Sequence, residues 1–337
     1  MTDPRLDPEP GLPARLLAGI ARKLLPLPPD PPPLDQIRSV LVVRTDDRVG
    51  NALLTIPLLR GLQKALPRAR VDLLLAARRA HVAEGLPDLR VIRFDKRLPQ
   101  PGLFRKYEVV IDAAHWHAFS LTSALLSRWA ASRWVIGSRR GPSQIYSQAV
   151  PPPQDGVPEV VAKLDLARAL GLQVSVFPME TALGLHAPTP VSGRFAALNP
   201  GARKDDHRLP PERFAALARA LPLRSVVFWG PGEESLARAV VDAAHGAAEL
   251  APPTDLEQLA AAFRAAALVV TNDTGPMHLA VACGAPVLAL FKDQAGLRWA
   301  HPGPKFAAAV APDDAALAHA ALRLLDSAST AAEPPAP

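Results

Sequence analysis

The stretch LVVTNDTGPMHLAVACGAPVLALF, residues 268–291, carries the pattern from which the fold can be predicted. Its first apolar run, residues 268–271, is too short for a helix and is typical of a buried strand in a parallel sheet. A polar turn at 272–275 follows, a Gly–Pro pair opens a helix over 276–283, and a second apolar run occupies 286–291. Strand, turn, helix and strand in this order predict a βαβ unit.

The same alternation extends from this unit in both directions along the chain. Residues 172–193 interrupt it, because they have no periodicity and contain three prolines, and we interpret them as a linker. On either side of the linker we expect further strands at residues 39–44, 71–75, 91–94, 109–111, 134–136, 195–198, 225–229 and 248–250, and helices at residues 51–66, 119–131, 158–170, 211–221, 233–244, 256–265 and 313–327.

This order predicts an α/β protein with two Rossmann-like, doubly wound domains that face each other across a cleft. Ligands of such sheets bind beyond the carboxyl ends of the strands. We place the N-terminal Rossmann-like domain at residues 37–185 and the C-terminal one at residues 186–327. Residues 1–36 form an N-terminal extension, and residues 328–337 a disordered tail.

Composition narrows the class of protein. The chain has 337 residues, of which 49% are hydrophobic and 21% charged, enough apolar material for two cores. A single cysteine, Cys283, excludes an intramolecular disulfide and a multi-cysteine metal site. The N-terminus lacks the pattern of a signal peptide, so we expect a cytoplasmic protein. The net charge of +6 favours anionic partners, but the scattered basic residues and two tyrosines do not indicate nucleic acid.

The N-terminal extension contains a basic amphipathic segment, residues 12–27, followed by the Pro-rich spacer PPDPPP. Two interpretations are open. The segment can lie on an anionic membrane, which would make the protein peripheral on the cytoplasmic face of the inner membrane, or it can be a helix packed on the body of the protein. At helical spacing it carries the apolar residues Leu16, Leu17, Ile20, Leu24 and Leu25 beside the basic residues Arg15, Arg22 and Lys23.

The turn within residues 268–291 is a candidate anion site. The free N–H groups of the helix that follows can bind a phosphate, and Thr274 adds a hydroxyl donor. His278 lies close to the start of this helix, whereas Asp273 is better suited to accept hydrogen bonds from sugar hydroxyls or from loop N–H groups. A helix-capping role for Asp273 or Thr274 is the alternative.

Four motifs in order resemble glycosyltransferase family 9, the ADP-heptose:lipopolysaccharide heptosyltransferases and their relatives. They are VLVVRTDDRVGNALLTIPLLRGLQKALP (40–67), LNPGARKDDHRLPPERFAALARAL (198–221), VVFWGPGEESLARAV (226–240) and DTGPMHLAVACGAPVLALF (273–291). The resemblance implies a GT-B fold and metal-independent, inverting transfer of a sugar from a nucleoside diphosphate, most simply ADP-heptose as substrate, to a lipopolysaccharide-core or other glycolipid acceptor. It implies no cofactor and no metal.

The resemblance also suggests roles for individual residues. Asp273, Thr274, Gly275 and His278 match the donor-binding signature. Glu233 matches a glutamate that contacts the nucleoside, although a carboxylate also suits a helix N-terminus. Gly201 and Arg203 match the loop near the phosphates. The family's Lys-x-Trp-Pro motif is His-Arg-Leu-Pro in this chain, so that its lysine is absent. Lys204 and Arg208 can still supply positive charge to the diphosphate.

The chain departs from the family at the catalytic base. The family's Gly-Asp pair is Gly50–Asn51 here, and an amide accepts no proton at pH 7. Either Asp46 or Asp47, just upstream, is a candidate substitute. His115 and His117, which follow a predicted strand, are a second possibility, with structural or surface roles as the alternative.

Two other functions compete with glycosyl transfer. A catalytically impaired GT-B homologue that binds a nucleotide-sugar or glycolipid as a scaffold would explain Asn51. An NAD-dependent oxidoreductase shares the α/β alternation, but the first predicted strand is not followed by G-x-G-x-x-G.

Overall fold

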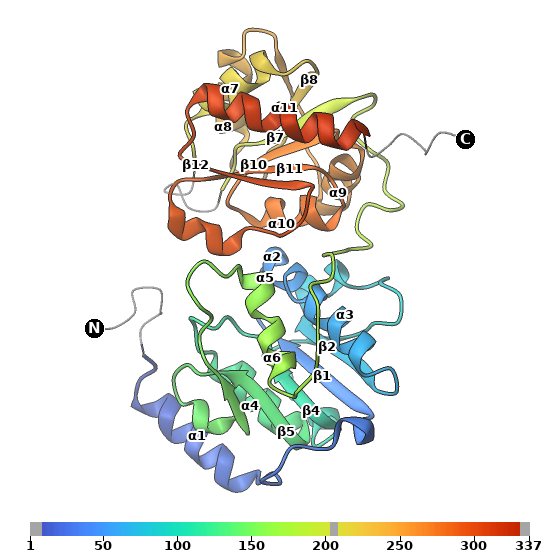
Figure 1. The fold of residues 1–337 in the computed structure, drawn as a ribbon, viewed down its shortest axis with the longest axis vertical. Coiled ribbons are helices and arrows are strands. Elements are labelled where there is room, and N and C mark those ends of the chain that lie inside the picture. The colour runs from blue at the N-terminus through green and yellow to red at the C-terminus, as the bar shows by residue number, and fades with distance from the viewer. Residues whose placement is uncertain (1–8, 203–207, 331–337) are drawn as a thin grey trace. The chain divides into compact units, whose positions relative to one another are not determined.

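The computed structural model describes residues 9–202 and 208–330 and divides the chain into two compact units, residues 1–178 and 179–337. Each unit contains one six-stranded parallel sheet with helices on both faces (Figure 1). Two Rossmann-like, doubly wound α/β units are therefore confirmed. The border of the compact units falls in the proline-containing stretch that we interpret as the linker, and from 169 to 194 the described chain forms no helix or strand.

The sheet of unit 1 has the strand order β3-β2-β1-β4-β5-β6. Its strands are β1 (Ser39–Arg44), β2 (Arg70–Ala76), β3 (Arg90–Phe94), β4 (Tyr107–Asp112), β5 (Ala131–Ser138) and β6 (Gln148–Val150), and its α-helices are α1 (Leu12–Leu24), α2 (Val49–Leu53), α3 (Ile56–Ala65), α4 (Leu121–Ala130), α5 (Glu159–Ala162) and α6 (Leu164–Arg168).

The sheet of unit 2 has the order β12-β11-β10-β7-β8-β9, which repeats the topology of unit 1. Its strands are β7 (Phe195–Asn199), β8 (Arg224–Val227), β9 (Ala248–Leu250), β10 (Leu268–Asn272), β11 (Val287–Phe291) and β12 (Phe306–Val310), and its α-helices are α7 (Pro211–Ala220), α8 (Glu234–Ala243), α9 (Leu256–Ala265), α10 (Gly275–Ala282) and α11 (Asp314–Thr330).

The central strands are buried because both of their faces are covered by helices. All five residues of β10 and of β11 are buried, as the continuous apolar runs predict. In unit 2 one core cluster joins Phe214 of α7 and Leu317 of α11 to the β-strand residues Val270 and Leu288. In unit 1 a cluster joins Ala18 of α1 and Ala124 of α4 to Leu41 and Val43.

Two helix predictions were wrong. The helix expected at 51–66 is two helices, α2 and α3, since Pro57 lies in the first turn of α3 and has no N–H to continue an earlier helix. The helix expected at 158–170 is divided at Lys163 into α5 and α6. The edge strands β6 and β12 and the short 3₁₀ helix η6 (Gln294–Trp299) were not predicted, because short edge elements carry little apolar pattern.

The N-terminal segment forms α1, which packs on α4 in unit 1. Its contact with the body of unit 1 is confirmed, although it leaves large apolar side chains exposed. No helix in the described part of the chain is both long and apolar enough to cross a membrane. Of the predicted disordered tail, residues 328–330 belong to α11, and residues 331–337 lie outside the described residues.

Candidate functional site

In each unit the candidate residues lie where the strand order reverses. The connections from two adjacent central strands leave in opposite directions at such a point, and the loops after them form the ligand-binding edge of a doubly wound sheet. In unit 1 these strands are β1 and β4, and in unit 2 they are β7 and β10. The loop with Asp46 and Asp47 follows β1, and the loop with His115 and His117 follows β4, so the topology brings both predicted groups to one edge.

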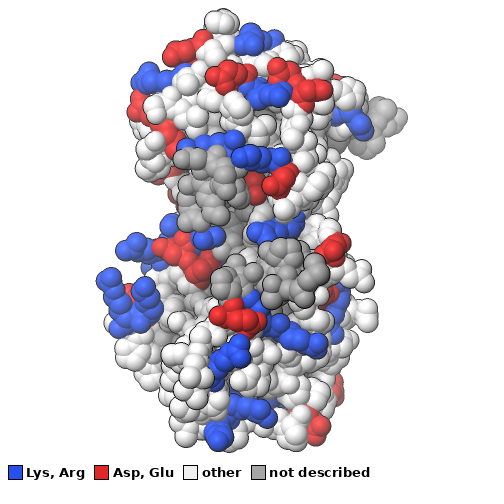
Figure 2. All heavy atoms as spheres, turned by 90° about the vertical axis from the view of Figure 1, so that its left-hand side faces the viewer, with Lys and Arg blue, Asp and Glu red and all other residues white. Residues whose placement is uncertain are grey.

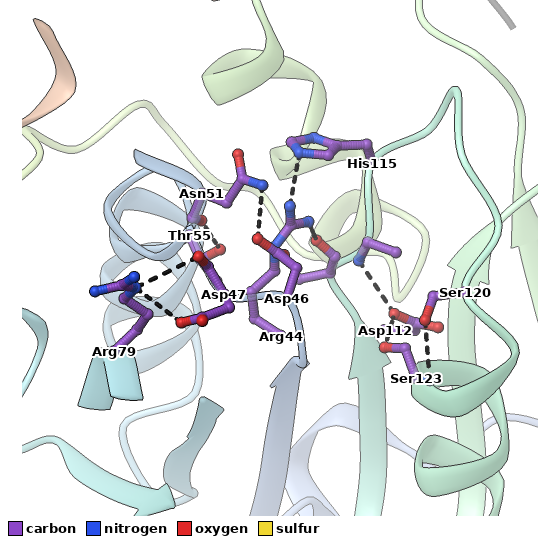
Figure 3. A network of polar contacts seen from close by, with 12 residues as sticks. Arg44, Asp46, Asp47, Asn51, Thr55, Arg79, Asp112, His115, Ser120 and Ser123 are labelled. Atoms are coloured by element: carbon purple, nitrogen blue, oxygen red, sulfur yellow. Dashed lines mark hydrogen bonds and ion pairs between the residues drawn. The ribbon is translucent and has the colours of Figure 1, made fainter. Parts of the chain in front are cut away.

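Arg44, the last residue of β1, is at the centre of the unit 1 edge (Figure 3). Its side chain is only 2% exposed. Its guanidinium donates to the backbone carbonyl of Ala113, lies 2.6 Å from Nε2 of His115, and forms a 2.5 Å ion pair with Asp46. Arg44 therefore connects the loop after β1 to the loop after β4.

The contacts of His115 determine which ring nitrogen carries its proton. A guanidinium can only donate, so Nε2 of His115 accepts from Arg44. Nδ1 then carries the proton and donates to Oε1 of Glu159 over 2.5 Å. Burial, and after it the charge of Arg44, lowers the pKa of His115 to about 3, so the ring is neutral near pH 7. Its lone pair is already used.

Glu159 and Lys163 form a buried ion pair behind His115. Nζ of Lys163 lies 3.1 Å from Oε1 of Glu159, and the two side chains are 2% and 1% exposed. Burial alone would raise the pKa of Glu159, but Lys163 and His115 outweigh it and hold this pKa well below its usual value. Burial lowers the pKa of Lys163 to about 8 in spite of Glu159. With Arg44 and Asp46, this cluster has two positive and two negative charges around a neutral histidine.

Asp46 is the one carboxylate of this charge-balanced cluster that is partly accessible, with 36% of its side chain exposed. Oδ2 pairs with Arg44, and Oδ1 accepts from Nδ2 of Asn51 over 2.7 Å. Burial alone would raise the pKa of Asp46, but Arg44 and Asn51 outweigh burial and hold it below its usual value. The amide at 51 thus donates a hydrogen bond to a carboxylate five residues upstream.

Asp47 and His117 lie in different surroundings from Asp46. Asp47 is 47% exposed, and its carboxylate pairs at 2.8 Å with the half-buried Arg79. Its side chain is directed to Arg79 rather than into the cluster around Arg44 (Figure 3). His117 is buried and stacks on His115, with ring centroids 5.0 Å apart and planes 11° from parallel.

His115, His117 and Glu159 place potential metal-ligand atoms within 4.8 Å of one another. Two observations argue against a cation there. The Nε2 lone pair of His115 already accepts from Arg44, and Oε1 of Glu159 is already held by Lys163 and by Nδ1–H of His115. Arg44 and Lys163, which contact His115 and Glu159, would also repel a divalent ion. The donor set does not fit a resident metal.

Asp112, at the end of β4, is a support that sequence reasoning missed. It is 1% exposed and accepts from Oγ of Ser123 at 2.6 Å, from the hydroxyl of Tyr146 at 2.7 Å and from N–H of Ala114. Burial raises the pKa of Asp112. These bonds fix the start of the loop that carries His115, and only the tertiary structure brings Tyr146 to this strand.

In unit 2 two buried amides, also missed from the sequence, hold the loop after β7 against the end of β10. Nδ2 of Asn272 donates to the carbonyl of Pro200 over 2.7 Å, and its Oδ1 accepts from N–H of Leu209. Asn199 donates to Oγ1 of Thr271. A buried Asn at the end of each adjacent strand is the signal that could have indicated this pairing.

Gly201, Glu233 and Arg208, which the resemblance suggests as site residues, lie close together at this edge. A Cβ at Gly201 would lie 2.1 Å from Oε2 of Glu233, so only glycine allows this carboxylate to approach. Glu233 also accepts from N–H of Gly230 at 3.1 Å and lies 3.5 Å from Arg208. The predicted residues Arg203 and Lys204 lie outside the described residues.

The turn before α10 presents Asp273, Thr274 and Gly275 at the end of β10, all three partly accessible. Thr274 occupies the N-cap position but makes no side-chain cap hydrogen bond, unlike a residue whose role is capping. His278 is buried, and its Nδ1 lies 2.8 Å from Nε2 of His301. Burial lowers the pKa of His301 to about 4, so this second ring, not found from the sequence, is neutral near pH 7.

A hollow of about 140 Å³ lies beside Asp273 at the carboxyl ends of β10 and β11. Lys292, Arg298 and Trp299 line it, and the Arg298 guanidinium lies 5.1 Å from the centre of the Trp299 ring. Nε of Arg298 is buried and has no hydrogen-bond partner in the described part of the chain. Asp293 lines the hollow as well, so two cations, two carboxylates and an aromatic ring suit a hydroxyl-bearing ligand with an anionic part.

Comparison with known proteins identifies the family. No curated protein sequence matches the chain. Among solved structures, the E. coli heptosyltransferase WaaC with ADP has a TM-score of 0.67 and 24% identity and covers 86% of this chain and 99% of its own. E. coli ADP-heptose lps heptosyltransferase II has a TM-score of 0.61 and 19% identity, covering 87% and 98%. A family 9 glycosyl transferase from Veillonella parvula has a TM-score of 0.64 and 21% identity, covering 76% and 81%.

The model of glycosyltransferase family 9 (heptosyltransferase) matches residues 97–314, more than half of the chain. The loop with Asp46 and Asn51 precedes this match, and the edge of unit 2 lies within it. The chain therefore belongs to glycosyltransferase family 9, the heptosyltransferase family.

Proposed function

We propose that this glycosyltransferase transfers a heptose from ADP-heptose to a lipopolysaccharide-core-type glycolipid, with inversion at the anomeric carbon and without a metal. Family membership supports the transfer reaction. The donor is suggested by structures of E. coli WaaC, which has a similar fold and is described with ADP and with ADP-2-deoxy-2-fluoro heptose.

The observation that carries this proposal is the hollow that Asp273 lines together with two cations and an aromatic ring. Its volume of about 140 Å³ is below the ~300–1,000 Å³ of complete ligand sites, so it suits one part of the donor, for which we propose the diphosphate. Lys292 and Arg298 supply positive charge to the phosphates, and Asp273 accepts hydrogen bonds from sugar hydroxyls. Glu233, about one fifth exposed, is proposed to accept from the ribose.

In the proposed reaction the acceptor hydroxyl oxygen attacks the anomeric carbon of the heptose. As the new C–O bond forms, the bond from the anomeric carbon to the phosphate oxygen breaks, and its electron pair leaves with ADP. Attack opposite the leaving group inverts the configuration. The hydroxyl proton must go to a base, and a positioned base contributes roughly 10²–10⁴-fold to the rate.

We assign this base to Asp46. Its carboxylate is ionised and partly accessible, and with Arg44 and Asn51 bound it keeps lone pairs for a hydroxyl donor. Asp47 is 47% exposed and pairs with Arg79, away from the cluster around Arg44 (Figure 3). His115 is less suited than Asp46, because the lone pair of its Nε2 already accepts from Arg44.

A glycolipid acceptor is anchored in a bilayer, so we propose that the enzyme acts as a peripheral protein at the cytoplasmic face of the inner membrane. The basic chain, with its net charge of +6, suits an anionic membrane surface.

A scaffold protein that binds donor or acceptor without turnover is the second candidate. Asn51 favours it, because an amide stands where the family has the proposed base. The two candidates differ in one observable: both bind ADP-heptose, and only the enzyme releases ADP in the presence of an acceptor.

Calorimetric titration with ADP-heptose tests the donor site. Asp273→Ala, Lys292→Ala and His278→Ala are each expected to weaken binding roughly 10- to 150-fold, the loss for a hydrogen bond to a charged group. Asp242→Ala, at an exposed carboxylate on α8, is the matched control and is expected to bind like wild type. Unchanged affinity in all three site variants would refute the donor site. Mass spectrometry of a lipopolysaccharide-core acceptor then distinguishes enzyme from scaffold.

A further inference from the structure

The helix α1 packs on unit 1 with its small residues and exposes its large apolar ones. Ala18 is fully buried, and Ala14 and Ala21 are partly buried beside it. On another side, a row at four-residue spacing comprises Leu12, Leu16, Ile20 and Leu24, which are 68%, 58%, 51% and 74% exposed. A helix that only packed on the body would turn these side chains inward.

Positive charge flanks this apolar row. The helix LPARLLAGIARKL contains Arg15, Arg22 and Lys23 and no acidic residue. Beside it, Arg128 donates to the backbone carbonyls of Leu25 and Ile145. Burial, and after it the charges of Arg22 and Arg105, lowers the pKa of Arg128, which indicates that these guanidinium groups lie close together.

An exposed aromatic pair continues the surface at the carboxyl end of α1. The rings of Phe104 and Trp129 lie 4.4 Å apart and are 48% and 36% exposed. Their sequence neighbours hold them next to the helix, because Arg105 donates to the carbonyl of Pro26 and Arg128 to that of Leu25. Aromatic side chains of this kind are enriched at the water–lipid boundary.

We propose that α1, together with Phe104 and Trp129, is a membrane-binding surface that lies in the headgroup region of an anionic bilayer. Leucine and isoleucine side chains enter the acyl boundary, and the flanking cations meet the phosphates. Figure 2 views the side on which α1 lies, and the lower part of unit 1 there has Lys and Arg groups standing out from a largely uncharged surface. This distribution fits a lipid surface better than a second copy, which would place like charges against one another.

The position of α1 within unit 1 relates the membrane-binding surface to the acceptor, and this relation rests on the proposed function. Pro10, just before α1, packs on Gly141 together with Phe119. Phe119 belongs to the loop after β4, and Gly141 follows β5, so the helix begins beside segments at the carboxyl edge of the sheet. A bilayer bound along α1 would bring a membrane-anchored acceptor toward the edge that carries Asp46.

The test is flotation of the full-length protein with two kinds of vesicle. One contains phosphatidylcholine alone, and the other contains phosphatidylcholine with about 30% phosphatidylglycerol. Both are used in roughly 0.1 M salt, where charges on the surface are only moderately screened. Wild type is expected to float with anionic vesicles and much less with neutral ones. The variant Leu16→Gln/Ile20→Gln/Leu24→Gln keeps good helix formers at exposed positions and is expected to bind roughly 100-fold more weakly. The matched control Val176→Gln/Leu185→Gln/Leu322→Gln changes exposed apolar residues elsewhere and is expected to bind like wild type.

Two measurements keep the result separate from the donor site. ADP affinity is expected to be equal in wild type and the α1 variant. Loss of vesicle binding with unchanged ADP affinity therefore supports the membrane-binding surface. Failure of the wild type to bind ADP would contradict the proposed function and not this surface. Wild type that stays unbound to anionic vesicles, or an α1 variant that binds them as tightly, would overturn the proposal. A dimer in sedimentation equilibrium that the α1 variant abolishes, without vesicle binding, would overturn it in favour of a second copy.

Discussion

Neutralising one member of the buried Glu159–Lys163 pair tests whether the charge balance behind His115 holds the unit 1 edge together. The changes are Glu159→Gln, Lys163→Met and the double variant. Each single change leaves one unpaired charge in a site where both side chains are at most 2% exposed. The double change removes both charges and leaves Arg44 paired with Asp46.

The expected cost follows from this burial. Removing one partner of a buried pair costs about 3–5 kcal/mol, because the remaining charge stays desolvated without its counter-charge. For a unit of this size, about 2–4 °C of melting temperature per kcal/mol corresponds to a decrease of roughly 6–20 °C. The double variant is expected to lose less than either single variant, since replacement of both charges leaves none unpaired.

Thermal unfolding followed by circular dichroism measures these shifts. The matched control is the pair Glu234–Arg238 on α8, which has the same i,i+4 spacing but side chains 44% and 62% exposed. Its single variants are expected to cost at most about 1 kcal/mol. If Glu159→Gln and Lys163→Met behave like this control, or if the double variant loses the sum of the two, the buried charge balance is not what stabilises this edge.

The remaining predictions concern catalysis and pH. Asp46→Asn is expected to reduce turnover roughly 10²–10⁴-fold with unchanged ADP affinity, and Asp47→Asn to stay near wild type; steady-state kinetics that show full turnover in both variants would place the base elsewhere. His115 and His301 are neutral in the folded protein, with pKa values lowered to about 3 and 4 by burial, but take a proton near pH ~6.5 when unfolded. The contribution of these neutral histidines to the free energy of unfolding is therefore complete above that pH. Below it, the free energy of unfolding falls by up to ~1.4 kcal/mol per pH unit for each histidine. Urea unfolding at pH 7 and pH 5 checks this slope, and His301→Gln is expected to reduce it.

The fold could be predicted because its signals are local. Continuous apolar runs, a Gly–Pro pair after a polar turn, and the regular return of both patterns indicate buried parallel strands and the helices between them. The errors were local as well. Pro57 divides an apolar stretch that looks continuous, and β6 and β12 lie at sheet edges, where no second neighbouring strand imposes a strong apolar pattern.

The amphipathic pattern of residues 12–27 predicted a helix but not the direction of its faces. In the structure Ala18 packs into the core cluster that includes Ala124 of α4, and Leu16 and Ile20 are exposed. Periodicity reports which residues share a face, and only the surrounding surface decides which face it accepts.

The sequence by itself determined two doubly wound units, the family, and the loops in which Asp46, Asn51 and Asp273 occur. Only the tertiary structure decided what surrounds them: Arg44 pairs with Asp46 and takes the lone pair of His115, and Lys163 balances Glu159. The physical reason is that strand and helix patterns depend on neighbours in sequence, whereas ionisation and hydrogen-bond roles depend on burial and charge contributed by segments far apart in the chain.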